Sequence, residues 1–572
     1  MRRILAISIL LAFATAIFPQ SPKYEMRAVW LTTIGGLDWP HSYAQSRTAA
    51  KAQQEELCQL LDRYKQAGIN TVLLQTRVRG TVIYPSAFEP WDGCLSGKPG
   101  VSPGYDALQF AIDQCHRRGM QLHAWVVTIP VGKWNSTGCS RLRKQFPKAI
   151  THLGQDGYMN PEQPQTAEYL AKICEEIVTK YDVDGIHLDY IRYPEEWPQV
   201  RSRRGGKNIV STSAATRRNH ITNIVRQIHH RVKALKPWIM LSCAPIGKRD
   251  DLTRYSSRGW NAYTRVHQDA VGWLEEGLMD ALFPMMYFRG NHFYPFAVDW
   301  AQHAHGRIIA PGLGIYLLAP SEGNWALDII TQEMNVLRQQ GLGHAYFRGR
   351  FLTDNTKGIY DFVTNTFDHT PALIPPMTWL KAEVPMTPAN LNIERLTKQD
   401  GTPAVRLTWR AELSDSLFNV YSSRNWPVNT EDAHNLIATR LQSPSITFET
   451  STDGRYFAIT TLDRYGNESK PLQQSQPPHL QKNKSQTASI QSLSETLPLL
   501  QCKGKYLFLP SKPSALDADH IIIETLQGRI AVTRSYGNDE KINISTLPPG
   551  NYIVKSLNHR GITHRLGFFQ KR

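Results

Sequence analysis

Apolar runs of strand length alternate with amphipathic helical segments over the first two thirds of the chain. Continuous apolar runs of this length are typical of strands buried on both faces. The predicted strands are Met26 to Thr33, Asn70 to Thr76, Met120 to Thr128, Ile186 to Ile191, Trp238 to Ala244, Asp280 to Tyr287, Arg307 to Ile315 and His344 to Phe347. The predicted helices are Thr48 to Ala67, Tyr105 to Arg118, Gln165 to Tyr181, Ala215 to Lys236, Asp269 to Glu276 and Trp325 to Gln340.

Repeated β-then-α units predict parallel strands, and eight of them predict an α/β fold, a closed (β/α)8 TIM barrel over residues 21–370. An open doubly wound sheet is the alternative, but Thr32 to Leu37 lacks the GxGxxG spacing of its phosphate turn. Segments after strands are long and those after helices are short. The active site of such barrels is built by the post-strand loops, so the elaborated face is the expected site.

Beyond the barrel, prolines from Thr370 to Pro388 predict a linker. Four short β runs then predict a fibronectin type III-like β-sandwich over residues 386–475, with Trp409 in its core. These runs are Val405 to Trp409, Leu417 to Ser422, Ser445 to Thr450 and Tyr456 to Thr461. Gln473 to Thr496 is polar and predicts a second linker. Residues 497–572 are expected to form a small C-terminal β module, with strands at Ile521 to Glu524, Arg529 to Thr533 and Asn551 to Leu557.

The first twenty residues indicate export. Arg2 and Arg3 precede the apolar run Ile4 to Phe18, which is followed by polar sequence and is short for a membrane span. Residues 1–20 are therefore predicted to be a signal peptide, with an uncleaved anchor as the alternative. No stable membrane span is expected after its removal.

Composition limits the classes of partner and cofactor that we expect. The chain has a formal net charge of +16, which favours acidic partners such as anionic glycans or an anionic cell surface. The sequence has no basic stretch interleaved with aromatics, so a nucleic-acid-binding groove is not predicted. The seven cysteines show no metal-binding spacing, so neither metal nor cofactor is expected; Cys94 and Cys139, in predicted loops, are the candidate disulfide. The oligomeric state stays open.

The segment Asp184 to Pro194 carries the candidate chemistry. Its side chains alternate on the predicted strand, which places His187 and Asp189 on one face. A carboxylate near the C-terminal end of a buried strand is costly to place unless it has a role, so Asp189 is the candidate catalytic carboxylate. The alternative role is a structural ion pair with Arg192 or with the arginines after the second strand.

Several stretches together resemble the glycosyl-hydrolase-like family 10 group of bacterial TIM-barrel proteins. They are Glu25 to Leu31 with Asp38-Trp39-Pro40, Gln75-Thr76-Arg77 with Tyr84-Pro85-Ser86, Gly104-Tyr105-Asp106 leading to His116 to Gly119, His123-Ala124-Trp125, Asn160-Pro161, Asp184 to Pro194, Pro284 to Tyr287 and Gly312-Leu313-Gly314. The resemblance implies a glycoside hydrolase, and characterised relatives act on bacterial cell-wall glycan. Val126 to Pro130 departs from the family's usual continuation after the third-strand tryptophan.

Glycosidic cleavage needs a protonated carboxyl and a second carboxylate. Asp38, just after the first strand, is the predicted partner of Asp189. The other candidates for the second carboxylate are Glu195, Glu196, Asp250, Asp251 and Glu322. The predicted substrate-binding residues are Arg77, Arg79, Trp125, Asn160, His187, Tyr190, Arg192, Tyr287, Tyr316 and Trp325.

These observations favour an exported glycoside hydrolase that cleaves a bacterial envelope glycan, with a peptidoglycan-type amino-sugar strand as one such substrate. Two alternatives remain: a glycan-binding surface protein without turnover, and a hydrolase of dietary or host polysaccharide. The segment around Asp189 also resembles the catalytic strand of family 18 chitinases, but Ile191 and Arg192 stand where their proton-donating Glu would be. A direct two-carboxylate mechanism is therefore expected.

Overall fold

The computed structural model describes residues 21–571 except 198–200, 205–206, 211, 412, 414, 450–454, 475–499, 510–519, 526–529, 536–540 and 558–562. The predicted signal peptide and most of the second predicted linker lie outside the described residues. Within the part of the chain that is described, no helix has the length and apolar character needed to cross a bilayer.

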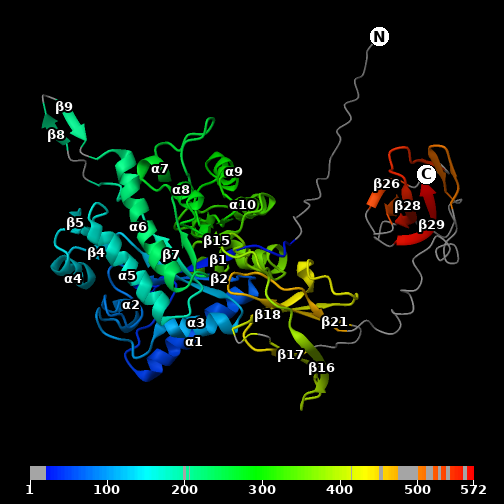
Figure 1. The fold of residues 1–572 in the computed structure, drawn as a ribbon, viewed down its shortest axis with the longest axis horizontal. Helices are drawn as coiled ribbons and strands as arrows, with labels where there is room; N and C mark the ends of the chain where they lie inside the picture. The colour runs from blue at the N-terminus through cyan, green and yellow to red at the C-terminus, as the bar shows by residue number, and fades with distance from the viewer. Residues whose placement is uncertain are drawn as a thin grey trace, which may run out of the picture. The chain divides into compact units, whose positions relative to one another are not determined.

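Eight parallel strands form a closed barrel, and two of them are interrupted by a proline (Figure 1). They are β1 (Arg27–Leu31), β2 (Thr71–Arg77), β3 (Gln121–Val127), β7 (Gly185–Asp189), β10 (Met240–Cys243), β11 with β12 (Ala281–Leu282, Met285–Met286), β13 with β14 (Ile308–Ile309, Gly312–Leu313) and β15 (His344–Tyr346). Pro284 and Pro311 cause the breaks because proline has no N–H for the ladder. Since β11 pairs with β13, and β12 with β14, the ring closes, which confirms the predicted barrel.

Helices surround the strands, and the six predicted helices are all present. They are α1 (Arg47–Gln66), α3 (Ala107–Arg117), α5 (Pro164–Lys180), α6 (Ala214–Leu235), α8 (Ala270–Glu275) and α10 (Leu327–Gln339). The sequence prediction missed α9 (Tyr294–Gln302), which lies between the sixth and seventh strands. Its proline in the first turn and its aromatic-rich composition obscure the helical periodicity on which the prediction depends.

Two apolar layers follow from the alternation of side chains along the strands. Val72, Leu74 and Leu122 point outward into the core between strands and helices. Trp30 and Phe283 point inward and help to fill the barrel interior. The interior is therefore a packed core, and only its upper end, where the strands finish, is available for a site.

The loop after β3 carries structure of its own. It forms an antiparallel sheet in the order β4-β6-β5, made of β4 (Pro130–Lys133), β6 (Asp156–Met159) and β5 (Ile150–Leu153). Helix α4 (Thr137–Gln145) connects β4 to β5. The loop after β7 carries a hairpin, β8 (Arg201–Arg204) and β9 (Lys207–Val210). The sequence predicted the length of these loops but not their regular structure.

A β-sandwich follows the barrel. One sheet contains β16 (Ala389–Thr397), β17 (Pro403–Arg410) and β20 (Ser445–Glu449), and the other contains β19 (Leu436–Leu441), β18 (Leu417–Ser423), β21 (Tyr456–Leu462) and β22 (Leu472–Gln473). Trp409 is buried between the sheets, with its ring 5.3 Å from that of Phe418. The four predicted strands are present, and β16, β19 and β22 are additional.

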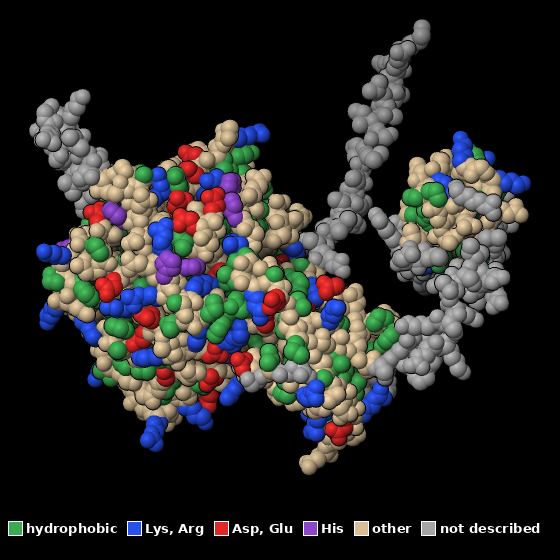
Figure 2. Space-filling view, in the orientation of Figure 1, with side chains coloured by type: hydrophobic (Ala, Val, Ile, Leu, Met, Phe, Trp, Pro, Cys, Tyr) green, Lys and Arg blue, Asp and Glu red, His purple; other side chains and the backbone are tan. Residues whose placement is uncertain are grey.

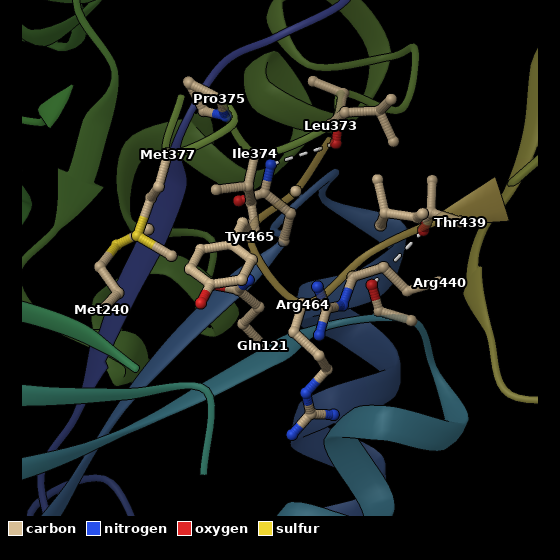
Figure 3. A pocket seen from close by; sticks show the side chains of 15 residues that line it. Gln121, Met240, Leu373, Ile374, Pro375, Met377, Thr439, Arg440, Arg464 and Tyr465 are labelled. Carbon is tan, nitrogen blue, oxygen red and sulfur yellow. Dashed lines mark hydrogen bonds between the residues drawn. The ribbon is translucent and has the colours of Figure 1, made fainter. Parts of the chain in front are cut away.

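The sandwich packs on the barrel face where the strands begin. Arg440 Nη2 lies 2.5 Å from Asp184 Oδ1, immediately before β7, and Gly119 before β3 is in contact with Thr439. Figure 3 shows Tyr465 and Ile374 side by side at this interface, where the remaining cavity is about 20 Å³. Barrel and sandwich form one compact unit that ends at Gln474. The sandwich thus covers the end of the barrel where the strands begin, opposite the end that carries Asp189.

Residues 475–572 form a second unit. It has a three-stranded sheet of β23 (Cys502–Lys503), β24 (Tyr506–Phe508) and β27 (Lys541–Asn543), and a four-stranded sheet of β26 (Ile530–Ser535), β25 (His520–Thr525), β28 (Gly550–Leu557) and β29 (Thr563–Lys571). Leu507, Ile523, Val554 and Phe569 belong to its core. The three predicted strands of this module are present.

All seven cysteines are unpaired, so the candidate Cys94–Cys139 disulfide is not formed. Cys94 is buried in the short helix α2 (Gly93–Ser96). Cys139 is a buried residue of α4 and lies against Gly157 of β6. Loop position alone suggested the pair, but the two thiols pack into different parts of the core.

Candidate active site

A cavity of about 510 Å³ opens at the end of the barrel where the strands finish. Successive strands and the residues that follow them contribute Thr32, Gln75, Arg79, Val127, Asp189, Tyr287, Phe347 and Arg348 to its wall. The loop sheet after β3 adds Pro130, Asp156 and Tyr158. This is the face on which (β/α)8 barrels carry their active sites.

Asp189 is the last residue of β7 and lies in this cavity with 6% of its surface exposed. Trp125 Nε1 donates a hydrogen bond to Oδ2 at 3.1 Å, and the Tyr190 backbone N–H donates to Oδ1 at 2.7 Å. Burial raises the pKa of Asp189, although the Arg192 charge and these two donors oppose the effect. The environment therefore favours the protonated acid, the form that can donate a proton.

Tyr190 lies at the mouth of the cavity because β7 ends at Asp189, two residues before the predicted end at Ile191. Its backbone φ is +53°, and 43% of its surface is exposed. The Arg192 guanidinium lies 4.7 Å from the centre of the Tyr190 ring. This turn brings Tyr190 into the same cavity as Asp189, whereas regular alternation would place it on the opposite face.

Aromatic side chains form one wall. Tyr287 stacks on Phe347 with ring centres 5.1 Å apart, and both line the cavity together with Trp125. The Tyr316 ring meets Tyr287 edge-on at 5.7 Å and supports this wall from outside the cavity. Flat apolar faces of this kind suit the packing of sugar rings. Phe347 was not identified from the sequence.

Two predicted arginines, Arg77 at the end of β2 and Arg79 just after it, differ in their surroundings. Arg77 is fully buried, pairs with Glu89 at 2.7 Å, and donates to the backbone carbonyls of Val127 and Thr128. It joins β2 to β3 and does not reach the cavity. Arg79 is exposed and lines the cavity, so of the predicted pair only Arg79 is placed to meet a ligand.

Asp38, the predicted second carboxylate, is buried in an ion pair and hydrogen bonds beside the cavity. It is 1% exposed and does not line the cavity. Its Oδ1 lies 2.7 Å from Arg348 Nη1, and its Oδ2 accepts a hydrogen bond from the backbone N–H of Thr32 at 2.8 Å. Asp38 is therefore not among the described residues that line the cavity with Asp189, although both of these partners are. Instead, Asp38 holds Arg348, which does line the cavity.

Three other predicted substrate-binding residues, His187, Asn160 and Trp325, do not line this cavity. His187 is in the barrel interior, where Trp30 Nε1 donates to its Nε2 at 3.2 Å and Ser242 Oγ lies 3.0 Å from its Nδ1. Burial lowers the pKa of His187 well below its ordinary value, so it is neutral. Asn160 accepts a bond from the Glu162 N–H in a local turn. Trp325 is half-buried beside Arg289, with the guanidinium 5.8 Å from the ring centre.

A neighbouring cavity of about 320 Å³ shares Tyr190, Tyr158, Asp156 and Pro130 with the first. Arg192, Glu195 and Glu196 line it, so these predicted residues lie next to the candidate site. Asp250, Asp251 and Glu322 line neither cavity. Asp156 lines both, and the sequence analysis missed it because loop length indicated the face but not the residue.

In the described part of the chain, no group of three or more His, Cys, Asp or Glu residues is arranged to hold a metal ion.

A (β/α)8 barrel with a buried acid in an aromatic-walled cavity at the strand ends is the arrangement that glycoside hydrolases use. The sequence comparison gives the family. The chain belongs to the Glycosyl hydrolase-like 10 family, whose model matches residues 25–313.

Named relatives agree with this assignment. The chain is 29% identical over 389 residues to "Glycosyl hydrolase YngK" of Bacillus subtilis (strain 168), covering 64% of this chain and 76% of the relative. It is 31% identical over 294 residues to "Glycosyl hydrolase DigH" of Escherichia coli (strain K12), covering 47% and 67%. Among solved structures, the PgaB (BpsB) glycoside hydrolase domain from Bordetella bronchiseptica aligns with 12% identity over 59% of this chain and 98% of that one, with a TM-score of 0.40.

Proposed function

We propose that this protein is an exported glycoside hydrolase that cleaves glycosidic bonds of a bacterial envelope glycan, with peptidoglycan-type amino-sugar strands as the substrate to test first. The observation that carries the proposal is Asp189: a carboxyl whose pKa is raised by burial, at the end of a barrel strand, in a cavity large enough for sugar rings. Membership of a glycosyl-hydrolase-like family supports the same reaction class.

In this reaction Asp189 acts as the general acid. Cleavage of a glycosidic bond leaves an oxygen that must be protonated as the bond breaks. Trp125 and the Tyr190 N–H fix the direction of the carboxyl by binding one oxygen each. Tyr287, Phe347 and Trp125 supply apolar faces for the sugar rings beside it.

Export and the choice of an envelope glycan rest on the sequence. Residues 1–20 have the pattern of a signal peptide, and the net charge of +16 suits an anionic glycan or surface. Figure 2 shows basic and acidic side chains interspersed over the visible face of the larger unit, so the excess charge there is spread out. We also propose that the sandwich of residues 386–475 is of the fibronectin type III kind and that residues 497–572 are a separate module.

The test compares three proteins that lack residues 1–20: the unaltered chain, Asp189→Asn and Glu322→Gln. Glu322 is the matched control because it is an exposed post-strand carboxylate that lines neither cavity. We expect the unaltered chain and Glu322→Gln to release reducing ends from purified peptidoglycan. Asp189→Asn should reduce that release by at least about 100-fold, the usual contribution of a general acid, while still sedimenting with the glycan.

Two results would refute the proposal. If Asp189→Asn releases reducing ends as fast as the unaltered chain, Asp189 is not the acid. If the unaltered chain sediments with peptidoglycan but releases nothing, the protein binds glycan without turnover.

A further inference from the structure

We infer that Asp156 is the second carboxylate of the reaction and takes the proton from the attacking water. The inference rests on the proposed hydrolase function and adds to it a residue outside the barrel strands. Among the described residues that line the cavity, Asp156 and Asp189 are the two carboxylates.

The loop sheet after β3 fixes the direction in which Asp156 points. Side chains alternate along β6, so Asp156 and Tyr158 share one face while Gly157 and Met159 share the other. Met159 is buried in the outer core, and a Cβ on Gly157 would lie 2.3 Å from Cys139 Sγ. Because that face is packed against α4, Asp156 and Tyr158 are turned toward the cavity, which both of them line.

The hydrogen bonding of Asp156 is incomplete. Its Oδ2 lies 3.3 Å from Lys133 Nζ on the adjacent strand β4, in register with it. Its Oδ1 is buried and has no hydrogen-bond partner among the described residues. The side chain as a whole is 31% exposed and lines the cavity, so water in the cavity has access to the rest of it.

Asp156 and Asp189 reach the cavity from different elements, since Asp189 ends β7 and Asp156 begins β6 of the loop sheet. The two hydrogen bonds to the Asp189 carboxyl come from Trp125 and from the Tyr190 backbone, and neither joins it to Asp156. In the proposed reaction a water lies between acid and base, which is the arrangement of inverting enzymes.

The step balances without a further reactant. Asp156 accepts a proton from the water as the water oxygen bonds to the anomeric carbon. The bond from that carbon to the glycosidic oxygen breaks, and Asp189 delivers its proton to the departing oxygen. The products are two shorter glycan chains, and the proton on Asp156 returns to Asp189 through solvent. The new reducing end has the inverted anomeric configuration.

Activity measurements on variants test this role. On purified peptidoglycan, Asp156→Asn should lower kcat by about 100-fold or more with KM changed by less than about threefold, because a base acts on the chemical step. Azide should restore turnover to Asp156→Ala, since it replaces the activated water, and should not restore Asp189→Asn. Glu322→Gln and the thermal unfolding midpoint of each variant are the controls for general damage.

The outcomes separate the two proposals. If the unaltered chain hydrolyses the glycan and Asp156→Asn keeps kcat within about threefold of it, or if NMR finds the retained anomer as the first product, the role of Asp156 is refuted while the hydrolase function stands. If the unaltered chain releases no reducing ends, the hydrolase proposal fails and this inference fails with it.

Discussion

Glu333 gives a quantitative prediction about stability. It lies on the buried stripe of α10 with Ile330, Met334 and Leu337 and is 0% exposed. Neither of its carboxyl oxygens has a hydrogen-bond partner in the part of the chain that the structure describes. Burial raises the pKa of Glu333 from 4.5 to about 9. The folded chain therefore holds this group protonated at pH 7, while the unfolded chain ionises it.

The sign and size of the pH effect on stability follow from the linkage between proton binding and folding. Below pH 4.5 both states are protonated, so the difference in ionisation between them costs nothing. Between pH 4.5 and 9 the free energy of unfolding falls by about 1.4 kcal/mol for each pH unit. At pH 7, 2.5 pH units above the ordinary pKa, the loss is about 3 kcal/mol. The stability contributed by the neutral acid is thus present at low pH and lost as pH rises.

Glu333→Met removes the titrating group and keeps a side chain of similar length in an apolar stripe. We expect the stability gained by the variant over the unaltered chain to be larger at pH 7 than at pH 4.5 by about 3 kcal/mol. Urea unfolding followed by tryptophan fluorescence at pH 5, 6, 7 and 8 measures the difference. Glu333→Gln is the matched control: it should remove the pH dependence and stabilise less, because its amide stays without partners. Equal pH dependence in Glu333→Met and the unaltered chain would refute the reasoning.

Three further predictions concern other parts of the molecule. Arg440→Met leaves the buried Asp184 carboxylate without its sandwich partner and should destabilise the larger unit by about 3–5 kcal/mol; an unchanged unfolding midpoint would contradict this. Asp38→Asn should raise KM for glycan more than it lowers kcat, because it frees Arg348 at the cavity wall; a loss confined to kcat would instead favour a catalytic Asp38. Thiol titration in guanidinium chloride should find seven free thiols without reductant, and five would indicate a disulfide.

The barrel was predictable because parallel strands covered on both faces leave a continuous apolar signal. Each of the eight predicted strands is present, even where Pro284 and Pro311 divide a strand in two. Helix α9 was missed because its signal depends on periodicity, which its aromatic residues and first-turn proline obscure. The sequence also did not predict that the sandwich packs on the barrel, because this depends on the pairing of Arg440 with Asp184, two residues 256 positions apart.

For the site, the sequence alone determined the position of Asp189, because the end of a buried strand in a barrel fixes which face a side chain reaches. It did not decide which charged residues share that cavity with it. Asp38 and Arg77 have suitable positions in the sequence, but each is bound in a buried ion pair. Asp156 and Arg79 reach the cavity instead. Only the tertiary structure decides this, because it depends on which partner neutralises each charge once distant loops pack together.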